Sequence, residues 1–337
     1  MAVGILQWEN SDVWAAFPDA VEGRFDEKLV ELFHSTRIPD EQIVFLQDGE
    51  ATIDAIQKNL SGLLANTEED DLFILYFAGH GDWDSDTDEY YFINYDAKAD
   101  SRDNYWSIAS IFESIESGFN GSQVLLVGDC CYSVGLIERV KKLDSEIDYA
   151  CISSAYAHNS STGGWTFTES LYKGFLGDPV VDIDGDRLIT LYDLARYAEL
   201  EMAFIEEQKS MFLTTNNFAP QMLLSSVDSE IEAIEGKRVE VEYDGEWYKA
   251  KTLETQDSQA RIQYIIDQSE EWVEPERIRP YAPQMFAVGD EVEAQFDEEW
   301  YPATVKKAWY GLHLVSYEGY PPSWDEWVGS DYIRPRQ

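Results

Sequence analysis

Short apolar runs alternate with stretches of helical periodicity over the first two thirds of the chain. Several runs are apolar on both faces, as is typical of strands in a parallel sheet covered by helices. The pattern predicts strands at residues 3–6, 43–46, 72–77, 124–127 and 150–153. It predicts helices at residues 25–33, 52–64, 108–115 and 191–205, and a last short strand at 222–224 that would complete the sheet. This alternation favours a layered α/β domain over residues 1–225.

The pattern changes after residue 225. Residues 226–235 are polar and acidic, and we expect a linker there. Beyond it the chain repeats itself: Trp-Tyr at 247–248 matches Trp-Tyr at 300–301, and both units close with Ile-Arg-Pro. Short alternating strands separated by turns predict one small β-barrel at 236–281 and another at 287–336.

Two of the predicted strands end in residues that can do chemistry. Gly-His-Gly follows the strand at 72–77, and Asp-Cys-Cys follows the strand at 124–127. The carboxyl ends of parallel strands meet at one edge of a sheet, where ligands bind. A thiol needs a nearby imidazole to lose its proton, so His80 is a candidate base, with the N–H of Gly81 as a candidate oxyanion donor. The alternative is a loop-capping histidine beside two packing cysteines.

In these motifs the chain resembles the caspase-like cysteine peptidases, most closely the metacaspase and bacterial orthocaspase branch. Tyr-Phe-Ala-Gly-His-Gly at 76–81 is similar to the family's Tyr-Phe-Ser-Gly-His-Gly, and Asp-Cys-Cys-Tyr-Ser-Val at 129–134 to its Asp-Ser-Cys-His-Ser-Gly. The resemblance covers roughly residues 1–225 and implies a caspase-hemoglobinase-like three-layer sandwich. It places the nucleophile at Cys131 rather than Cys130, and the Cys131 N–H as the second oxyanion donor. The sequence departs from the motif at Val134, which stands in the place of a glycine.

The resemblance also implies a substrate preference. Metacaspases take Arg or Lys before the scissile bond, using the aspartate two residues before the nucleophile, which is Asp129 here. A carboxylate at the floor of a pocket pairs with a guanidinium or ammonium group and rejects an acidic side chain. Glu9, after the first strand, is a second candidate for this pocket. The alternative is that Asp129 only orients its loop.

Residues 138–144 form a basic stretch that we expect to be a loop. The resembling family often carries a processing loop after the nucleophile, which suggests self-cleavage after Arg139, Lys141 or Lys142. A solvated turn between a helix and a strand is the alternative interpretation.

Alternating aspartates at Asp182, Asp184 and Asp186 resemble the start of a calcium loop, and Asp193 follows on the next helix. Arg187 stands where such a loop has glycine. The turn is therefore either a calcium site or a purely structural feature. The peptidase chemistry itself requires no cofactor, and the resemblance to metacaspases suggests calcium as an activator.

The two barrels resemble Tudor-like, SH3-like barrels of the Agenet and chromo-barrel kind. In the second barrel four aromatic residues fall where Tudor domains place an aromatic cage, namely Phe296, Tyr301, Tyr317 and Tyr320. Such a cage binds methylated ammonium or guanidinium groups by cation–π attraction. In the first barrel Tyr243, Tyr248 and Tyr264 match, but Asp267 replaces the fourth ring. An unmodified basic or Pro-rich peptide is an alternative ligand.

Composition narrows the choice of partners. The chain has 24 Lys and Arg against 66 Asp and Glu, a formal net charge of −42, which disfavours nucleic acid and anionic membranes and favours basic partners. Solubility or a saline habitat would explain the same charge. The sequence has no long apolar run, no basic leader and only three cysteines. We therefore expect no membrane span, no disulfide framework and a cytoplasmic location.

These observations together predict a cysteine endopeptidase that cleaves proteins after Arg or Lys. Its barrels would recruit a substrate or a regulator, and the family resemblance suggests a role in bacterial stress, cell death or phage defence. The alternative is a non-catalytic scaffold that uses the barrels to bind basic or methylated peptides.

Overall fold

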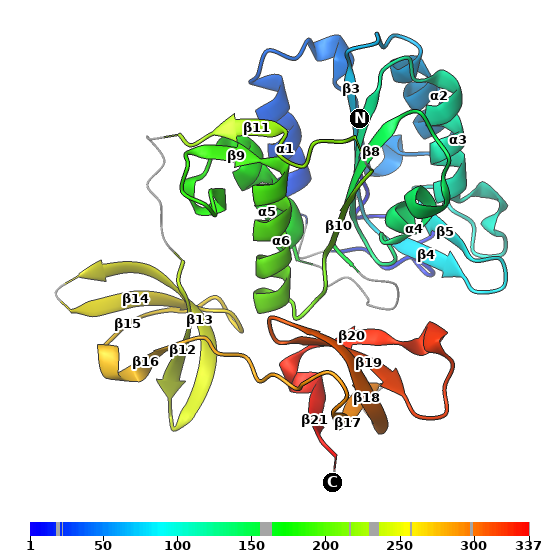
Figure 1. Cartoon of the computed structure of the whole chain (residues 1–337). Coiled ribbons are helices and arrows are strands. Elements are labelled where there is room, and N and C mark those ends of the chain that lie inside the picture. Colours follow the sequence, from blue (N-terminus) through cyan, green and yellow to red (C-terminus); the bar gives the residue numbers. More distant parts are fainter. Residues whose placement is uncertain are drawn as a thin grey trace.

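The structure of the protein is a computed structural model, drawn in Figure 1. It describes residues 1–17, 21, 23–155, 164–215, 217–228, 236–256, 258–296 and 299–336. Most of the expected linker, residues 229–235, lies outside the described residues. Within the described part, none of the helices is long and apolar enough to span a membrane.

A six-stranded sheet forms the centre of the first part of the chain. Its strand order is β10-β8-β7-β3-β1-β2, and all neighbours are parallel except β10 and β8. The strands are β1 (Ala2–Gly4), β2 (Phe45–Gln47), β3 (Leu72–Ala78), β7 (Gln123–Asp129), β8 (Asp148–Ser153) and β10 (Met211–Thr214). Each of these strands except β10 lies at or beside one of the apolar runs from which a strand is predicted. A strand covered by helices on both faces needs apolar side chains on both faces, which produces such a run.

Helices cover both faces of this sheet (Figure 1). One face carries α1 (Phe25–His34), α5 (Thr166–Leu176) and α6 (Leu191–Ile205), and the other carries α2 (Ile53–Leu64), α3 (Ile108–Gly118) and α4 (Gly135–Lys142). Side chains of β3 alternate between the two cores: Leu75 and Phe77 pack with α2 and α3, while Tyr76 and Ala78 pack with α5 and α6. The expected three-layer α/β fold with a mainly parallel sheet is confirmed.

Local sequence fixes where helices begin. Thr52 Oγ1 accepts the Ala55 N–H at 3.3 Å and caps α2. α6 starts with a capping box, in which Thr190 Oγ1 accepts the Asp193 N–H and Asp193 Oδ2 accepts the Thr190 N–H. The Asp193 carboxylate is therefore engaged in capping the start of α6.

Two features differ from the sequence prediction. The strand expected at 222–224 is β11 (Leu223–Ser226), but it pairs antiparallel with β9 (Leu188–Thr190) and does not complete the main sheet, whose edge is β10. A small sheet of β4 (Gly81–Asp84), β5 (Glu89–Phe92) and β6 (Trp106–Ser107) follows His80. Its strands are short, so they carry little periodic signal in the sequence.

Two five-stranded antiparallel sheets follow, as the internal repeat predicts. The first barrel contains β12 (Arg238–Tyr243), β13 (Glu246–Gln256), β14 (Gln259–Tyr264), β15 (Glu270–Val273) and β16 (Ile278–Pro280). The second contains β17 (Glu291–Phe296), β18 (Glu299–Trp309), β19 (Leu312–Tyr317), β20 (Glu326–Val328) and β21 (Ile333–Pro335). Both share one strand order, and both dock near the carboxyl end of α6 (Figure 1).

Candidate active site

The parallel pairing of β3 and β7 brings the two chemical motifs together. The last residue of β3 lies opposite Asp129, and the Gly79 N–H donates to the Asp129 carbonyl at 3.2 Å. Gly81 packs against the backbone of Cys131, because a Cβ atom on Gly81 would lie 1.9 Å from the Cys131 carbonyl oxygen. His80 lies between these two contacts, so the turn holds it next to the Cys131 segment.

The turn around His80 depends on its flanking glycines. Gly79 has a φ of +152°, and a Cβ there would lie 2.9 Å from the Ile5 carbonyl oxygen. The Ile93 N–H donates to the His80 carbonyl at 3.0 Å, so the next pair of the β4–β5 ladder, at Gly81, is a non-hydrogen-bonded pair. The ladder therefore does not use the Gly81 N–H, which lies beside Cys131.

The imidazole of His80 is oriented by a backbone carbonyl. Its Nε2 lies 2.8 Å from the Ala15 oxygen, and a carbonyl only accepts, so Nε2 carries the proton. In the neutral ring Nδ1 is then unprotonated. The rings of Trp8 and Phe17 lie 4.4 and 4.5 Å from the His80 ring. This burial lowers the pKa of His80, against the hydrogen bond to Ala15 that raises it, and keeps the imidazole neutral near pH 7.

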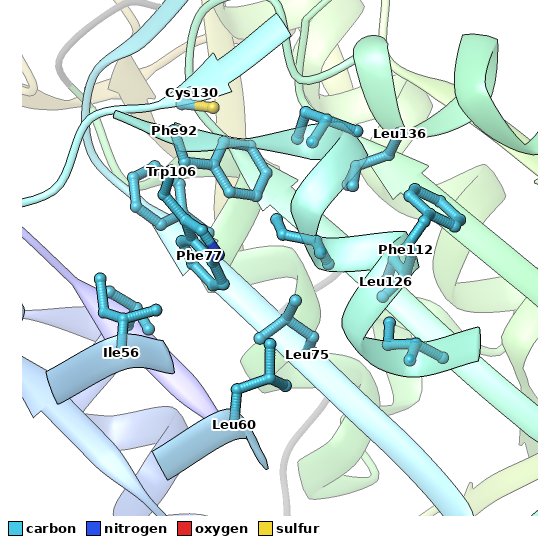
Figure 2. Close-up of a cluster of buried hydrophobic side chains, with 14 of the residues drawn as sticks. Ile56, Leu60, Leu75, Phe77, Phe92, Trp106, Phe112, Leu126, Cys130 and Leu136 are labelled. Carbon is cyan, nitrogen blue, oxygen red and sulfur yellow. The ribbon is translucent and has the colours of Figure 1, made fainter. Parts of the chain in front are cut away.

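The two adjacent cysteines have opposite environments. Cys130 is fully buried and joins the core near Phe92, as Figure 2 shows. Burial raises the pKa of the Cys130 thiol well above its usual range, so that thiol stays protonated. Cys131 is half-buried, and Tyr132 after it takes a left-handed φ of +58° that turns the chain into α4. Of the two thiols, only Cys131 has the exposure that a nucleophile needs.

The departure from the motif at Val134 fits the local backbone. Val134 has a helical conformation with φ −55°, which any residue adopts, and its side chain is buried. Glycine is required one residue later, since a Cβ on Gly135 would lie 2.5 Å from the Tyr90 ring.

Asp129 is a buried carboxylate at the end of β7. Its Oδ2 accepts the Thr168 hydroxyl proton at 2.6 Å, and the Tyr76 hydroxyl, 2.7 Å from Thr168 Oγ1, therefore donates to that oxygen. Burial raises the pKa of Asp129 to about 6, although the Thr168 hydrogen bond lowers it. A cation entering beside Asp129 would stabilise its ionised form.

The described contacts of Glu9 and of the Asp129 carboxylate lie on opposite faces of the sheet. Glu9 is exposed, and its backbone N–H donates to the Tyr95 carbonyl, on the side of the sheet that carries β4–β6. Asp129 is bonded to α5 on the opposite face. None of the described contacts joins Glu9 to Asp129, so a pocket shared by the two stays a prediction.

The basic stretch after the nucleophile is helical as far as Lys142, so the expectation of a loop was wrong for residues 138–142, and only residues 143–144 lie beyond the helix. Arg139, Lys141 and Lys142 lie in α4, where Lys141 pairs with Glu138 at 2.7 Å and Lys142 with Asp88 at 3.1 Å. The helix forms because its apolar residues pack on the sheet and its basic last turn complements the helix dipole. Cleavage after any of the three would require α4 to unwind.

The acidic turn satisfies its own backbone. Carboxylate oxygens of Asp182, Asp184 and Asp186 lie within 4.8 Å of one another, and each of the three carboxylates accepts backbone N–H groups of the turn. Arg187 adopts the left-handed φ of +69° that glycine usually supplies there. Asp193, which stands at the last ligand position of such a loop, is buried and caps α6. The residues present do not fit a complete calcium loop.

The second barrel contains an aromatic pocket. The four residues expected to form the cage line one cavity of about 140 Å³ together with a fifth ring, and the set is Phe296, Tyr301, Tyr317, Tyr320 and Trp324. Neighbouring ring centroids lie 5.2–6.5 Å apart, and most pairs are steeply inclined. The rings thus stand as walls around a space rather than stacking on each other. Beneath them Tyr317 donates to Glu326, a carboxyl group whose pKa is raised by burial.

The corresponding place in the first barrel differs. Tyr248 and Tyr264 stand 6.4 Å apart at 88°, but the carboxylate beneath them, Glu271, pairs with Arg277 at 2.5 Å. Glu271 corresponds in the repeat to Glu326 of the second barrel. The first barrel therefore supplies its own cation at the position where the second barrel has none of its own among the described contacts.

Sequence reasoning missed two residues of these sites. Glu206, at the end of α6, adds its negative charge to the surroundings of Asp129. No local pattern marks Glu206, because only the fold brings the two carboxylates together. Trp324 lies in a turn that the first barrel lacks, so comparison of the two repeats offers no counterpart.

Comparison with known proteins identifies the class of the second barrel. Residues 289–337 match the family model of the Agenet domain, which confirms the Tudor-like assignment there. Two solved Agenet structures, Arabidopsis thaliana AGDP1 AGD34 and the ADCP1 tandem Agenet domain 3-4, are each 23% identical over 30% of this chain, cover 81% and 79% of their own chains, and have a TM-score of 0.15. Protein GSU0716 from Geobacter sulfurreducens covers 68% of this chain and 99% of its own at 12% identity and a TM-score of 0.45. No curated protein matches the sequence.

Proposed function

We propose that the protein is a caspase-like cysteine endopeptidase that cleaves proteins after arginine or lysine. The observation that carries the proposal is the geometry of His80. Its Nε2–H is tied to the Ala15 carbonyl, and its backbone turn packs against Cys131. A neutral imidazole whose Nδ1 is unprotonated is the base that a thiol nucleophile requires. The resemblance of both motifs to metacaspases and orthocaspases supports the same reaction.

The proposed reaction is an acyl transfer in two steps. The Cys131 thiol gives its proton to His80 Nδ1, and the sulfur attacks the peptide carbonyl carbon. The N–H groups of Gly81 and Cys131 donate to the oxyanion, and His80 protonates the leaving amine as the C–N bond breaks. Water then gives a proton to His80 and attacks the thioester. The C–S bond breaks, and the thiol is restored.

Asp129 would provide the preference for a basic side chain. Its carboxylate is buried and held by Thr168, with no cation of the described residues paired to it by an ion pair. Leaving such a charge unpaired is unfavourable, and a substrate guanidinium or ammonium would relieve it. An acidic substrate side chain would be repelled by the Asp129 carboxylate.

Labelling with a reactive peptide ketone that ends in arginine tests this function. Cys131→Ala should abolish labelling and cleavage. Cys130→Ala is the matched control, and it should keep both because the Cys130 thiol is buried and protonated. Labelling that follows Cys130 instead of Cys131 would overturn the assignment.

We also propose that the second barrel recruits a substrate or regulator through a methylated or basic cation in its pocket. The support is the ring of five aromatic side chains above Glu326, whose counterpart in the first barrel is already paired with Arg277. Cation–π attraction and a nearby carboxylate favour the same ligand. Calorimetry with trimethyllysine peptides and their unmodified twins measures this binding directly.

The same pocket favours a second candidate function, that of a non-catalytic scaffold. Retained peptide binding by the barrels, together with no labelling of Cys131 with or without calcium, would favour the scaffold over the peptidase.

A further inference from the structure

The first turn of α5 holds two carboxylates from distant parts of the chain. Thr168 donates to Asp129, and Thr166 donates to Glu206, the residue that follows α6. The N-terminus of a helix stabilises negative charge, so both carboxylates are favoured at this position. The negative charge of Glu206 contributes to raising the pKa of Asp129, as expected for two carboxylates in electrostatic range.

Glu206 lies on an open cleft, whereas Asp129 is buried. A cleft of about 1040 Å³ runs between the α5–α6 pair and the first barrel, and Trp165, Thr166 and Glu206 are among the residues that line it. A ligand in this cleft would meet Glu206, which is bonded to the same turn of α5 that holds Asp129.

Glu207 binds the segment after α6 to both barrels. Its carboxylate pairs with Lys249 of the first barrel and accepts the Asp331 N–H of the second at 3.4 Å. Its backbone takes a left-handed φ of +50°, so the chain turns sharply next to Glu206. The two barrels therefore fix the direction in which the chain leaves α6.

The rest of this segment, residues 206–210, is enclosed in the same way. Lys209 is buried, lies 4.4 Å from the ring of Trp309 and pairs with Glu199 of α6. Ser210 Oγ donates to the Ser153 carbonyl at the end of β8. The segment thus connects the barrels to the strand ends that carry the candidate site.

We propose that Glu206 is a second specificity-determining carboxylate of the pocket that Asp129 forms, and that the docked barrels position it by holding residues 206–210. The inference rests on the proposed peptidase function, but ligand binding to the pocket can be measured without turnover. A guanidinium has five N–H donors in a plane and can bond two carboxylates at once, whereas an ammonium is a compact point charge. The pair of carboxylates should therefore prefer arginine to lysine.

Binding to the full chain carrying Cys131→Ala tests the pocket. The ligands are a tripeptide amide ending in arginine and its twin ending in citrulline, which is nearly isosteric but neutral. Glu206→Gln should reduce the arginine-to-citrulline affinity ratio by about tenfold to a hundredfold, as expected for loss of a charged hydrogen-bond partner. Glu270→Gln, an equivalent change in a carboxylate on the first barrel that pairs with Arg261, should leave the ratio unchanged.

An unchanged ratio in Glu206→Gln, or no preference for arginine in the parent protein, would overturn the inference. Failure of the proposed function gives a different result. If wild type neither cleaves nor is labelled while the Cys131→Ala protein still prefers arginine through Glu206, the peptidase is refuted and the pocket stands.

The positioning role of the barrels has its own test. Lys249→Gln removes one partner of Glu207 and should lower the arginine-to-citrulline ratio by a smaller factor. Combined with Glu206→Gln it should cause no further loss, because both act through one side chain. Arg261→Gln, an exposed change on the same barrel, is the control. Fully additive losses would show that Lys249 does not act through Glu206.

Discussion

Gly81→Ala perturbs the proposed catalytic centre while leaving every reacting group in place. The added methyl carbon would lie 1.9 Å from the Cys131 carbonyl oxygen and 3.1 Å from the Cys130 sulfur. Non-bonded carbon contacts are comfortable at about 3.5 Å, so the two backbone segments must separate by roughly 1 Å or more. Neither segment can yield easily, because each continues from a central strand of the sheet.

A displacement of about 1 Å in a catalytic centre costs on the order of a hundredfold in rate. That factor corresponds to about 2.7 kcal/mol of activation free energy. Overpacking should also lower the free energy of unfolding by about 1–3 kcal/mol, which leaves a folded protein to assay. We therefore expect kcat/KM for an arginine reporter peptide to fall about a hundredfold, with a modest decrease in Tm.

Gly62→Ala is the matched control. Gly62 is exposed in α2, and a Cβ there would meet nothing within 4 Å. This change should leave kcat/KM unchanged and stabilise the helix by about 1 kcal/mol. If Gly81→Ala keeps kcat/KM within about threefold of wild type and an unchanged Tm, the turn of His80 does not pack on Cys131 and the proposed centre is wrong.

The other predictions address charge, ligand and docking. Burial raises the pKa of Asp129 to about 6, so kcat/KM for an arginine reporter should fall as the pH drops through about 6 and this carboxylate is protonated. A pH profile identical to that of a citrulline reporter would contradict the role of Asp129 in binding arginine. Tyr301→Ala should weaken binding of a trimethyllysine peptide at least about tenfold by calorimetry, while Tyr248→Ala in the first barrel should not. Asp184→Ala should leave any calcium dependence of cleavage unchanged when calcium is restored after chelation, because the carboxylates of this turn already bond its own backbone. Loss of the calcium response in this variant would show that the turn binds calcium. Glu201→Gln should reduce the stability of barrel docking by about 1–3 kcal/mol, measured by limited proteolysis, because two cations lose a buried charged partner, and an unchanged proteolysis rate would contradict this.

The sequence predicts the parts of this molecule whose signal is local. Strands β3 and β7 are apolar on both faces, and that pattern alone indicates a covered parallel sheet. Parallel strands in register carry His80 and Cys131 to the same edge, which is why the pattern alone pairs two motifs that are far apart in the chain. Glu206 has no such signal. Its charge comes within electrostatic range of Asp129 only because α5 packs on α6.

The basic stretch of α4 shows why a local reading fails. Its charged residues suggest a loop, but the apolar residues before and between them, Leu136, Ile137 and Val140, are buried against the sheet. Burial of that face outweighs the preference of the charges for solvent, which they retain on the other face. The helix therefore forms where composition alone suggests a turn.

The internal repeat has the opposite weakness, because it makes two sites look equal. Tyr248 and Tyr301 occupy corresponding positions, yet Arg277 of the first barrel pairs with the carboxylate below the rings, and Tyr332 stands at its position in the second. The exchange of Arg277 for Tyr332 thus leaves an internal cation at this place in the first barrel and none at the corresponding place among the described contacts of the second. The sequence shows that Asp267 replaces one ring, but only the contact between Arg277 and Glu271 shows that the first barrel places a cation there.

Three of the few cations of this acidic chain hold the first barrel against the end of α6. Arg238, Lys249 and Lys251 of the first barrel all pair with Glu201 or Glu207, at the end of α6 or just beyond it. Burial raises the pKa of Glu201, but the charges of Lys251 and Arg238 hold it below its usual value, so the carboxylate stays ionised in a site where salt screens it little. Removing either the carboxylates or the cations of these pairs would leave buried charges unpaired. The free-energy cost of unpaired buried charges therefore opposes separation of the first barrel from α6.

The docked face of the second barrel is formed by other residues than its pocket. Leu312, Leu314 and Trp327 pack against Ala203 of α6, while Trp324 at the aromatic pocket remains 45% exposed. A ligand can therefore enter the pocket while the barrels stay docked and residues 206–210 stay in place. The proposed recruitment through the second barrel and the proposed recognition beside Asp129 are therefore compatible in one docked conformation.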